Sequence, residues 1–194
     1  SIPNIELISN DEYETTNMVW SLSKAKSFLN AETIISYGDI VFSPSILADL
    51  INSEADFAVA VDMNWKEYWN TRLDNPLLDA ETLKFKSGSN IIREIGKKTN
   101  TISDIEAQYI GLLKITKKGA QVLRKKLEED ISNCDMSNLD IKNAYMTDLI
   151  QNLINSGILV TGVPFYDDWL EIDTLEDLKS ETTLRRIMAI AQSL

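Results

Sequence analysis

Short apolar runs alternate with amphipathic stretches along most of the 194-residue chain. Such runs, bounded by polar turn residues, are typical of strands, and apolar residues spaced three or four positions apart are typical of helices. Strands are expected at residues 5–8, 33–37, 57–61, 91–95, 108–115, 158–163 and 169–172. Helices are expected from Thr15 or Thr16 to Leu29, from Pro44 to about Asn52, after Thr116 through Glu129, from about Leu139 to Asn155, and after Thr174. Between residues 65 and 87 both patterns weaken.

This alternation predicts an α/β fold with a Rossmann-like mixed sheet, mostly parallel, and helices on both faces. Residues 1–194 contain no repeat or linker and have the length of a single domain. In such sheets ligands bind beyond the carboxyl ends of the strands. The residues to inspect there are Asp39, Asp62, the segment Gly96-Lys97-Lys98, and Asp173.

The charge balance narrows the choice of partners. A net charge of −11 lacks the basic footprint of a nucleic-acid-binding protein and disfavours docking on an anionic membrane. No apolar stretch approaches the ~20 residues of a membrane-spanning helix. The lone Cys134 fits a reducing compartment, so the cytoplasm is expected.

The chain has no histidine, which removes histidine triads, histidine–zinc sites and histidine acid–base catalysis. Carboxylates, lysines, arginines and a hard metal ion remain. Magnesium is usually held by one or two carboxylates together with substrate phosphates and water. Asp39 and Asp173 at strand ends suit that role, although strand-end aspartates are equally typical turn formers and helix caps.

Four segments occur in an order that resembles a known family. They are Tyr37-Gly38-Asp39-Ile40-Val41-Phe42, residues 91–98, Ala107-Gln108-Tyr109-Ile110-Gly111-Leu112, and Trp169-Leu170-Glu171-Ile172-Asp173-Thr174 followed by Asp177-Leu178. Together they resemble the nucleotidyltransferases that include phosphocholine, aminoethylphosphonate and sugar-1-phosphate enzymes. The resemblance implies a nucleotide-diphospho-sugar transferase type of fold. It also implies attack of an acceptor phosphate or phosphonate on the α-phosphate of a nucleoside triphosphate, CTP being favoured, with release of pyrophosphate.

The resemblance also implies roles for individual residues. Asp39 and Asp173 would hold Mg²⁺, and Lys97 would neutralise the acceptor phosphate as a catalytic residue. Relatives often read Glu-Lys-Pro where this chain reads Gly-Lys-Lys, so Lys98 competes with Lys97, and a solvated surface pair is the plain alternative for both. Asn17 and Ser21 would contact the nucleotide, or they serve helix capping.

The acceptor site is expected from aromatic and polar side chains. Glu106 and Gln108 precede the Gly111 strand, where relatives contact the acceptor, although Glu106 is equally a plain loop carboxylate. Arg72 could clamp the acceptor phosphate, or pair with Asp74 or Asp79. Cation–π attraction, worth ~0.5–2 kcal/mol per contact, suits a cationic acceptor such as phosphocholine or aminoethylphosphonate. The candidate rings are those of Trp65, Trp69 and Trp169, with core or loop anchoring as the alternative.

One departure from the family pattern is large. Relatives begin with a strand and a Gly-x-Gly-x-Arg loop whose backbone N–H groups hold the triphosphate, and this sequence has no such loop. We expect an N-terminally truncated fragment, inactive in isolation and a possible homodimer. The alternatives are a non-catalytic assembly or regulatory domain, a sugar-1-phosphate nucleotidyltransferase, or a glycosyltransferase, whose usual Asp-x-Asp is absent at Asp39.

Overall fold

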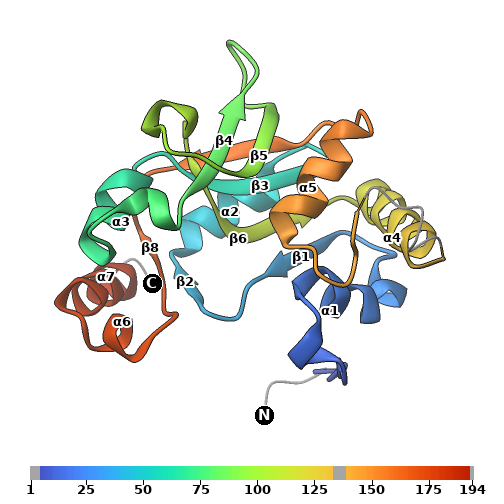
Figure 1. The fold of residues 1–194 in the computed structure, drawn as a ribbon, viewed down its shortest axis with the longest axis horizontal. Coiled ribbons are helices and arrows are strands. Elements are labelled where there is room, and N and C mark those ends of the chain that lie inside the picture. The colour runs from blue at the N-terminus through green and yellow to red at the C-terminus, as the bar shows by residue number, and fades with distance from the viewer. Residues whose placement is uncertain (1–4, 133–138, 193–194) are drawn as a thin grey trace.

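The computed structural model describes residues 5–132 and 139–192 (Figure 1). Its helices are α1 (Met18–Lys24), α2 (Pro44–Asn52), α3 (Trp65–Arg72), α4 (Lys117–Ser132), α5 (Met146–Asn155), α6 (Leu175–Lys179) and α7 (Glu181–Gln192). Its strands are β1 (Thr33–Ser36), β2 (Ile40–Phe42), β3 (Phe57–Asp62), β4 (Glu81–Phe85), β5 (Ile92–Lys98), β6 (Gln108–Ile115), β7 (Thr161–Phe165) and β8 (Trp169–Glu171). Short 3₁₀ turns are η1 (Tyr13–Thr15), η2 (Lys26–Phe28), η3 (Pro76–Leu78) and η4 (Ile102–Asp104).

A four-stranded mixed sheet in the order β1-β6-β3-β7 forms the centre of the molecule. Strand β6 runs antiparallel to both β1 and β3, whereas β3 and β7 are parallel. Two antiparallel ribbons flank this sheet, β4 with β5 and β2 with β8. The β4–β5 hairpin rises above the sheet, and β8 descends beside β2 toward α6 and α7 (Figure 1).

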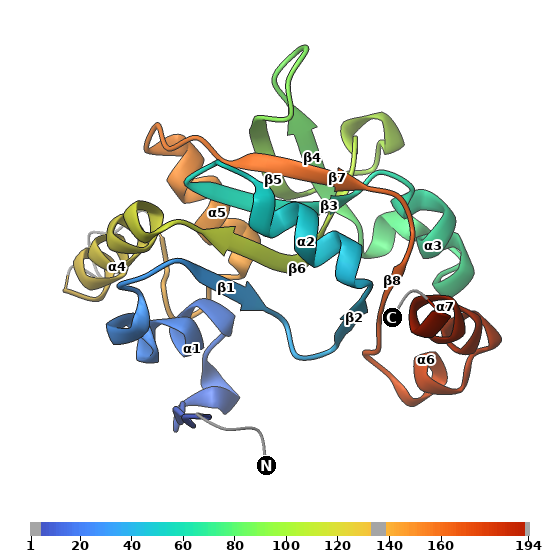
Figure 2. The ribbon, with the colours of Figure 1, turned by 180° about the vertical axis from the view of Figure 1, so that it is seen from behind.

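Helices cover both faces of the sheet, because alternate residues of β3 are directed into two different cores. Phe57, Val59 and Val61 join one buried cluster, and Ala58 and Ala60 join the other. The first cluster lies under α1, α4 and α5, and the second under α2, α3 and α7. Figure 2 shows α2 across the face of the sheet opposite to that covered by α5.

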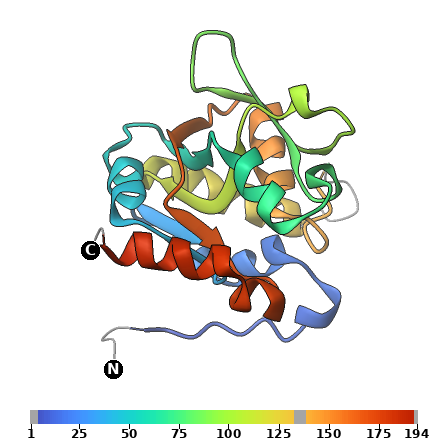
Figure 3. The ribbon, with the colours of Figure 1, turned by 90° about the vertical axis from the view of Figure 1, so that its left-hand side faces the viewer.

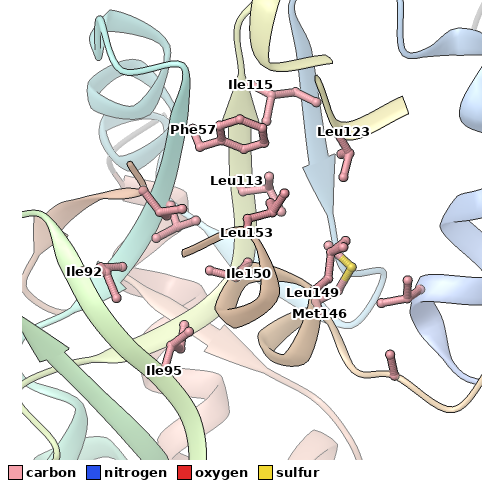
Figure 4. Close-up of a cluster of buried hydrophobic side chains, with 14 of the residues drawn as sticks. Phe57, Ile92, Ile95, Leu113, Ile115, Leu123, Met146, Leu149, Ile150 and Leu153 are labelled. Atoms are coloured by element: carbon pink, nitrogen blue, oxygen red, sulfur yellow. The ribbon is translucent and has the colours of Figure 1, made fainter. Parts of the chain in front are cut away.

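Helix α5 shows how sequence periodicity produces this packing. Its buried residues Met146, Leu149, Ile150 and Leu153 follow the three-to-four spacing of one helical face. Figure 4 shows these side chains against β5, β6 and the neighbouring strands. Removing one such side chain, as in Leu149→Ala, is expected to cost about 2–5 kcal/mol because the cavity closes only partly.

Several helix boundaries follow the predicted capping chemistry. Thr174 and Asp177 form a capping box at the start of α6, and Pro44 occupies the first turn of α2. The Thr116 hydroxyl accepts a hydrogen bond from the backbone N–H of Gly119 at the start of α4. At the end of α5, Gly157 adopts a φ of 84°, which glycine reaches without strain.

The mixed α/β sheet with helices on both faces is confirmed, but most of its ladders are antiparallel rather than parallel as expected. The chain between β3 and β6 contains α3 and the β4–β5 hairpin instead of one crossover helix, so β6 enters in the opposite direction. The prediction of a strand at residues 5–8 is wrong. That segment has no ladder partner, and it extends past the body with Leu7 92% exposed (Figure 3).

The structure also adds elements that the sequence patterns did not indicate. Helix α3 and strand β4 occupy residues 65–87, and the short strand β2 follows Asp39. Helix α5 begins at Met146 rather than near Leu139. Cys134 lies outside the described residues. Over the described ranges, no helix is both long and apolar enough to cross a membrane.

Candidate active site

A cleft of ≈ 360 Å³ opens at the edge of the sheet where β1 ends and β6 begins. These two ends meet because β1 and β6 are antiparallel: Ser36 lies opposite Leu112, and the Tyr37 N–H donates to the carbonyl oxygen of Gly111 at 2.9 Å. Aromatic and polar side chains from most of the surrounding elements line this cleft. They are Met18, Tyr37, Trp69, Asp79, Glu81, Lys98, Gln108, Tyr109, Tyr145, Thr147 and Glu171.

Gly111 shapes the floor of the cleft. It adopts a φ of +81°, and the position of a Cβ atom at this residue is already filled by the Tyr37 ring. Tyr37 in turn packs edge-on against Tyr109, with ring centroids 5.9 Å apart. A glycine here therefore allows an aromatic ring to lie directly on the sheet beside the candidate site.

Lys98 and Glu81 face each other across the β4–β5 ladder. The Lys98 ammonium lies 3.9 Å from the Glu81 carboxylate and donates a hydrogen bond to the carbonyl oxygen of Asp79 at 2.9 Å. The ladder shifts register between Glu81 and Leu83, and Gly96 has a φ of +85° with Thr147 against its Cα. This bulge brings the end of β5 over the cleft.

Lys97 points elsewhere. Its ammonium binds the Glu94 carboxylate at 2.7 Å, is largely exposed, and lines a separate hollow against α5. Neighbouring strand residues point to opposite faces, so only one of the two lysines can enter the cleft. Lys98 therefore lines this cleft and Lys97 does not, and the catalytic role of either lysine stays a prediction.

Asp39 and Asp173 come together at the end of the β2–β8 ribbon. The Ile172 N–H donates to the carbonyl oxygen of Asp39 at 2.9 Å, one residue before Asp173. Both aspartates are exposed, and each lies two residues beyond a side chain that lines the cleft, Tyr37 and Glu171. The fold thus brings the backbones of the two predicted aspartates side by side, and their joint binding of a cation stays a prediction.

Arg72 at the end of α3 holds three carboxylates on this side of the cleft. Its guanidinium donates to Glu171, to Oδ2 of Asp173 at 2.7 Å and to Oδ1 of Asp177 at 3.2 Å. With its nitrogens occupied in this way, Arg72 does not present a fork to an acceptor phosphate, nor does it pair with Asp74 or Asp79. It fixes the Asp173 segment to α3.

The carboxylates near the cleft have perturbed proton affinities. Burial raises the pKa of Glu171 to about 7, against the opposing attraction of Arg72. Burial also raises the pKa of Glu81, and burial together with the negative charges of Glu81, Asp39 and Glu171 raises that of Tyr37. Burial thus favours the uncharged form of these three side chains.

The three predicted acceptor-binding tryptophans are mainly core residues, which corrects the expectation of an open aromatic wall. Trp65, Trp69 and Trp169 are at most 4% exposed and pack together with Tyr68. The indole N–H of Trp169 donates to the buried Asp62 carboxylate at 2.9 Å. Trp69 alone reaches the cleft, and its indole N–H donates to Asp79 at 2.9 Å.

The remaining predicted site residues separate into one that lines the cleft and three that do not. Gln108 lines it and donates from its amide to the Glu81 carbonyl oxygen at 2.6 Å. Glu106 accepts from the backbone N–H of Phe85 beside a different hollow. Asn17 caps α1, as the alternative interpretation held, and exposed Ser21 accepts a hydrogen bond from Asn10.

Comparison with known proteins identifies a related sequence and related folds. No protein-family model matches the chain. A curated relative, the CTP:phosphoglutamine cytidylyltransferase of Campylobacter jejuni, is 38% identical over 179 residues, covering 88% of this chain and 69% of the relative. The chain belongs to the nucleotidyltransferase family.

Solved structures show the same nucleotidyltransferase fold. The inositol-1-phosphate CTP transferase from T. maritima superposes with a TM-score of 0.67 at 19% identity, covering 94% of this chain and 65% of that one. The CTP:phosphocholine cytidylyltransferase of Streptococcus pneumoniae gives 0.58 at 16% identity, covering 92% and 67%. A putative glucose-1-phosphate thymidylyltransferase from Bacillus anthracis gives 0.59 at 16% identity, covering 93% and 63%. The chain thus spans about two thirds of the length of these proteins.

A metal ion in this nucleotidyltransferase domain would rest on few protein ligands. Among the described residues, no group of three or more Asp, Glu, Cys or His side chains could hold one. The donor chemistry of Asp39 and Asp173 nevertheless fits a hard cation, since magnesium needs only one or two carboxylates when substrate phosphates complete its shell. Arg72 donates to one oxygen of Asp173 and leaves the other outside that hydrogen bond.

Sequence reasoning did not single out several residues of the cleft, among them Glu81, Tyr145, Thr147 and Glu171. Glu81 lies in the stretch where both periodicities weaken, so no strand end drew attention to it. Tyr145 and Thr147 flank the start of α5, which was placed several residues too early. A signal existed for Glu171, which stands two residues before Asp173 and therefore on the same side of its strand.

Proposed function

We propose that the protein transfers a cytidylyl group from CTP to the phosphate of a small phosphorylated acceptor. An acceptor phosphate oxygen forms a bond to the α-phosphorus, the bond from that phosphorus to the bridging oxygen breaks, and pyrophosphate leaves with the electron pair. Phosphoglutamine is the first acceptor to test, because the Campylobacter jejuni relative named for it is 38% identical over most of this chain. That identity is the observation that carries the proposal.

The cleft provides what such a reaction needs from a protein. Phosphoryl-type transfer depends mainly on positioning and on neutralising charge, and it needs no histidine. Asp39 and Asp173 would hold a divalent cation, magnesium by preference, which would supply charge neutralisation at the triphosphate. Lys98 would bind an anionic group of the acceptor, and Gln108 would fix the Glu81 strand through its amide hydrogen bond.

Arg72 has a positioning role in this proposal. It ties Asp173 and Glu171 to α3, whose aromatic side chains are buried in the core. The Tyr68 hydroxyl reinforces the connection, since it accepts a hydrogen bond from the Glu171 N–H at 3.1 Å. The metal-binding aspartate would therefore be held in place by a rigid part of the fold.

A coupled pyrophosphate-release assay tests the proposal on the full-length gene product that contains this chain. With CTP, Mg²⁺ and phosphoglutamine we expect turnover, and with phosphoglutamine omitted we expect none. Phosphocholine, aminoethylphosphonate and sugar phosphates serve as competing acceptors. Turnover with a sugar phosphate alone would contradict the acceptor class, and no turnover with any of them would contradict the activity.

A cytoplasmic location and a homodimer remain predictions. The first is inferred from the single cysteine of the sequence. Cell fractionation and light scattering of the purified protein would check the two in turn.

A further inference from the structure

The cleft carries more negative than positive side chains. Asp79, Glu81 and Glu171 line it, and within the part of the chain that the structure describes Lys98 is the one lysine or arginine that does. Both substrates of a nucleotidyl transfer are anions, so an acidic lining needs a reason beyond the phosphates. A metal ion would account for the negative charge at the Asp39–Asp173 end of the β2–β8 ribbon. The negative charge on the β4–β5 side of the cleft has to be explained separately.

The three acidic residues differ in how well they are neutralised. The Asp79 carboxylate accepts the indole hydrogen bond of Trp69, and the Glu171 carboxylate is bound by Arg72. Glu81 has a hydrogen bond from the Thr147 side chain, and Lys98 stands 3.9 Å away while its ammonium donates to a backbone oxygen. Glu81 is thus the cleft carboxylate that faces Lys98, at a distance too long for a hydrogen bond between the two charged groups.

Burial makes this weak neutralisation costly. Desolvation in the cleft is the main cause that raises the pKa of Glu81. The side chain of Glu81 is partly buried, and such a carboxylate regains free energy when a hydrogen-bonding cation reaches it. Glu81 therefore favours a ligand that brings its own positive charge.

Lys98 presents the opposite charge at short range. Glu81 and Lys98 occupy facing positions of the β4–β5 ladder, so backbone pairing fixes their separation. The ammonium and carboxylate of an α-amino acid also stand side by side, on one carbon atom. Two opposite protein charges at 3.9 Å match such a head group in both sign and spacing.

Resting on the proposed function, we infer that Glu81 and Lys98 form a specificity pair for an acceptor with an amino-acid head group. Glu81 accepts hydrogen bonds from the α-ammonium, and Lys98 binds the α-carboxylate. The exposed Tyr145 and the Tyr37 ring flank this position. The acceptor class is therefore a phosphorylated amino acid rather than a phosphate ester that has no amino-acid head group.

Two analogues of phosphoglutamine test the pair on the full-length protein, one lacking the α-amino group and one lacking the α-carboxylate. Wild type is expected to use each analogue about 10- to 100-fold less efficiently, as measured by kcat/KM, because each loses a charged hydrogen bond. Glu81→Gln should reduce the penalty for the deamino analogue to within about threefold while keeping the penalty for the decarboxy analogue. Lys98→Gln should do the reverse.

The controls separate this inference from the proposed function. Glu54→Gln, an exposed carboxylate on the loop after α2, should keep both penalties, and the KM for CTP should stay within about twofold in Glu81→Gln. Use of both analogues by wild type as efficiently as phosphoglutamine, or unchanged penalties in the variants, would overturn the inference while cytidylyl transfer stands. Failure of wild type to transfer to phosphoglutamine or to any other acceptor would overturn the function itself. If Glu81→Gln does not fold, the same two analogues are measured with Glu81→Asp. The losses of kcat/KM that wild type shows with these analogues then still test the inference.

Discussion

Two kinds of strand-end aspartate can be compared in this molecule. Asp62 ends β3 and is fully buried, with its carboxylate accepting hydrogen bonds from the Trp169 indole and the Asn64 backbone N–H. Asp39 and Asp173 stand at the ends of the β2–β8 ribbon and are exposed beside the cleft. In the sequence all three look alike, as aspartates that follow apolar runs.

The difference lies in what the surrounding side chains leave open. A buried carboxylate whose oxygens accept hydrogen bonds from the protein serves the fold, whereas an exposed one next to a cleft can accept a ligand. Trp169 decides the matter for Asp62, because its buried indole N–H donates to that carboxylate. Strand-end position alone therefore does not identify a catalytic carboxylate.

The largest effect expected from this comparison is on turnover. Asp39→Asn and Asp173→Asn should each lower kcat for pyrophosphate release by at least about 100-fold, since each removes a charged ligand of the cation. Unfolding midpoints in urea should stay close to that of wild type. Asp49→Asn, an exposed carboxylate on α2, is the matched control and should keep full activity.

The two adjacent lysines extend the comparison from carboxylates to cations. Lys98→Ala should raise the KM for the acceptor about tenfold or more, because Lys98 faces the cleft. Lys97→Ala should change it less than about twofold, since the exposed Lys97–Glu94 pair lies on the other side of β5. Steady-state kinetics at saturating CTP measures both values. Equal effects of the two substitutions would show that the face of β5 does not determine the site.

Asp62 should behave as a structural residue. Asp62→Ala leaves the buried Trp169 indole without its acceptor, so we expect a loss of about 1–3 kcal/mol in the free energy of unfolding. Trp169→Phe should lower the free energy of unfolding less in the Asp62→Ala background than in wild type, because the carboxylate that accepts the indole hydrogen bond is already absent. Urea denaturation measures these values. A fully stable Asp62→Ala protein would show that burial at β3 is not what distinguishes this aspartate.

The smallest expected effect is a pH dependence of stability. Burial raises the pKa of Glu171 to about 7 in the folded protein, above its value of about 4.5 in the unfolded chain. Between these two pKa values the folded state binds more protons than the unfolded chain. The contribution of Glu171 to the free energy of unfolding is therefore complete below pH 4.5 and is lost as the pH rises through 7. Wild type should lose about 1 kcal/mol more than Glu171→Gln between pH 5 and 8. Parallel pH profiles of the two proteins in urea denaturation would contradict this.

Much of the fold was predictable because local patterns and packing agree. The apolar run of β3 and the amphipathic spacing of α5 were visible in the sequence, as was the capping box of Thr174 and Asp177. Strand direction was not predictable, because it depends on the hairpin of β4 and β5 between β3 and β6. The apolar residues 5–8 alternate like a strand but find no partner, since pairing is a property of the whole fold.

The candidate site was predictable where its residues stand at strand ends or in segments that resemble the family. Strand ends indicated Asp39 and Asp173, the resemblance indicated Gln108, and Lys98 remained as the alternative to Lys97. Glu81 reaches the cleft through a β-bulge, which no residue pattern in the sequence specified. Trp65, Trp69 and Trp169 are buried, and of the three Trp69 lines the cleft. The sequence left core anchoring and ligand contact both open, since an aromatic residue in an irregular stretch looks the same in either role.

The binding of a divalent cation together with CTP tests most directly whether the β2–β8 end is the catalytic centre. Electron paramagnetic resonance of free Mn²⁺, titrated into the full-length protein with CTP, measures the amount of cation bound beyond that held by CTP alone. We expect such binding in wild type and in Asp49→Asn, and its loss in Asp39→Asn and Asp173→Asn. Unchanged Mn²⁺ binding in both of the latter variants would contradict the assignment of the exposed aspartates to the site.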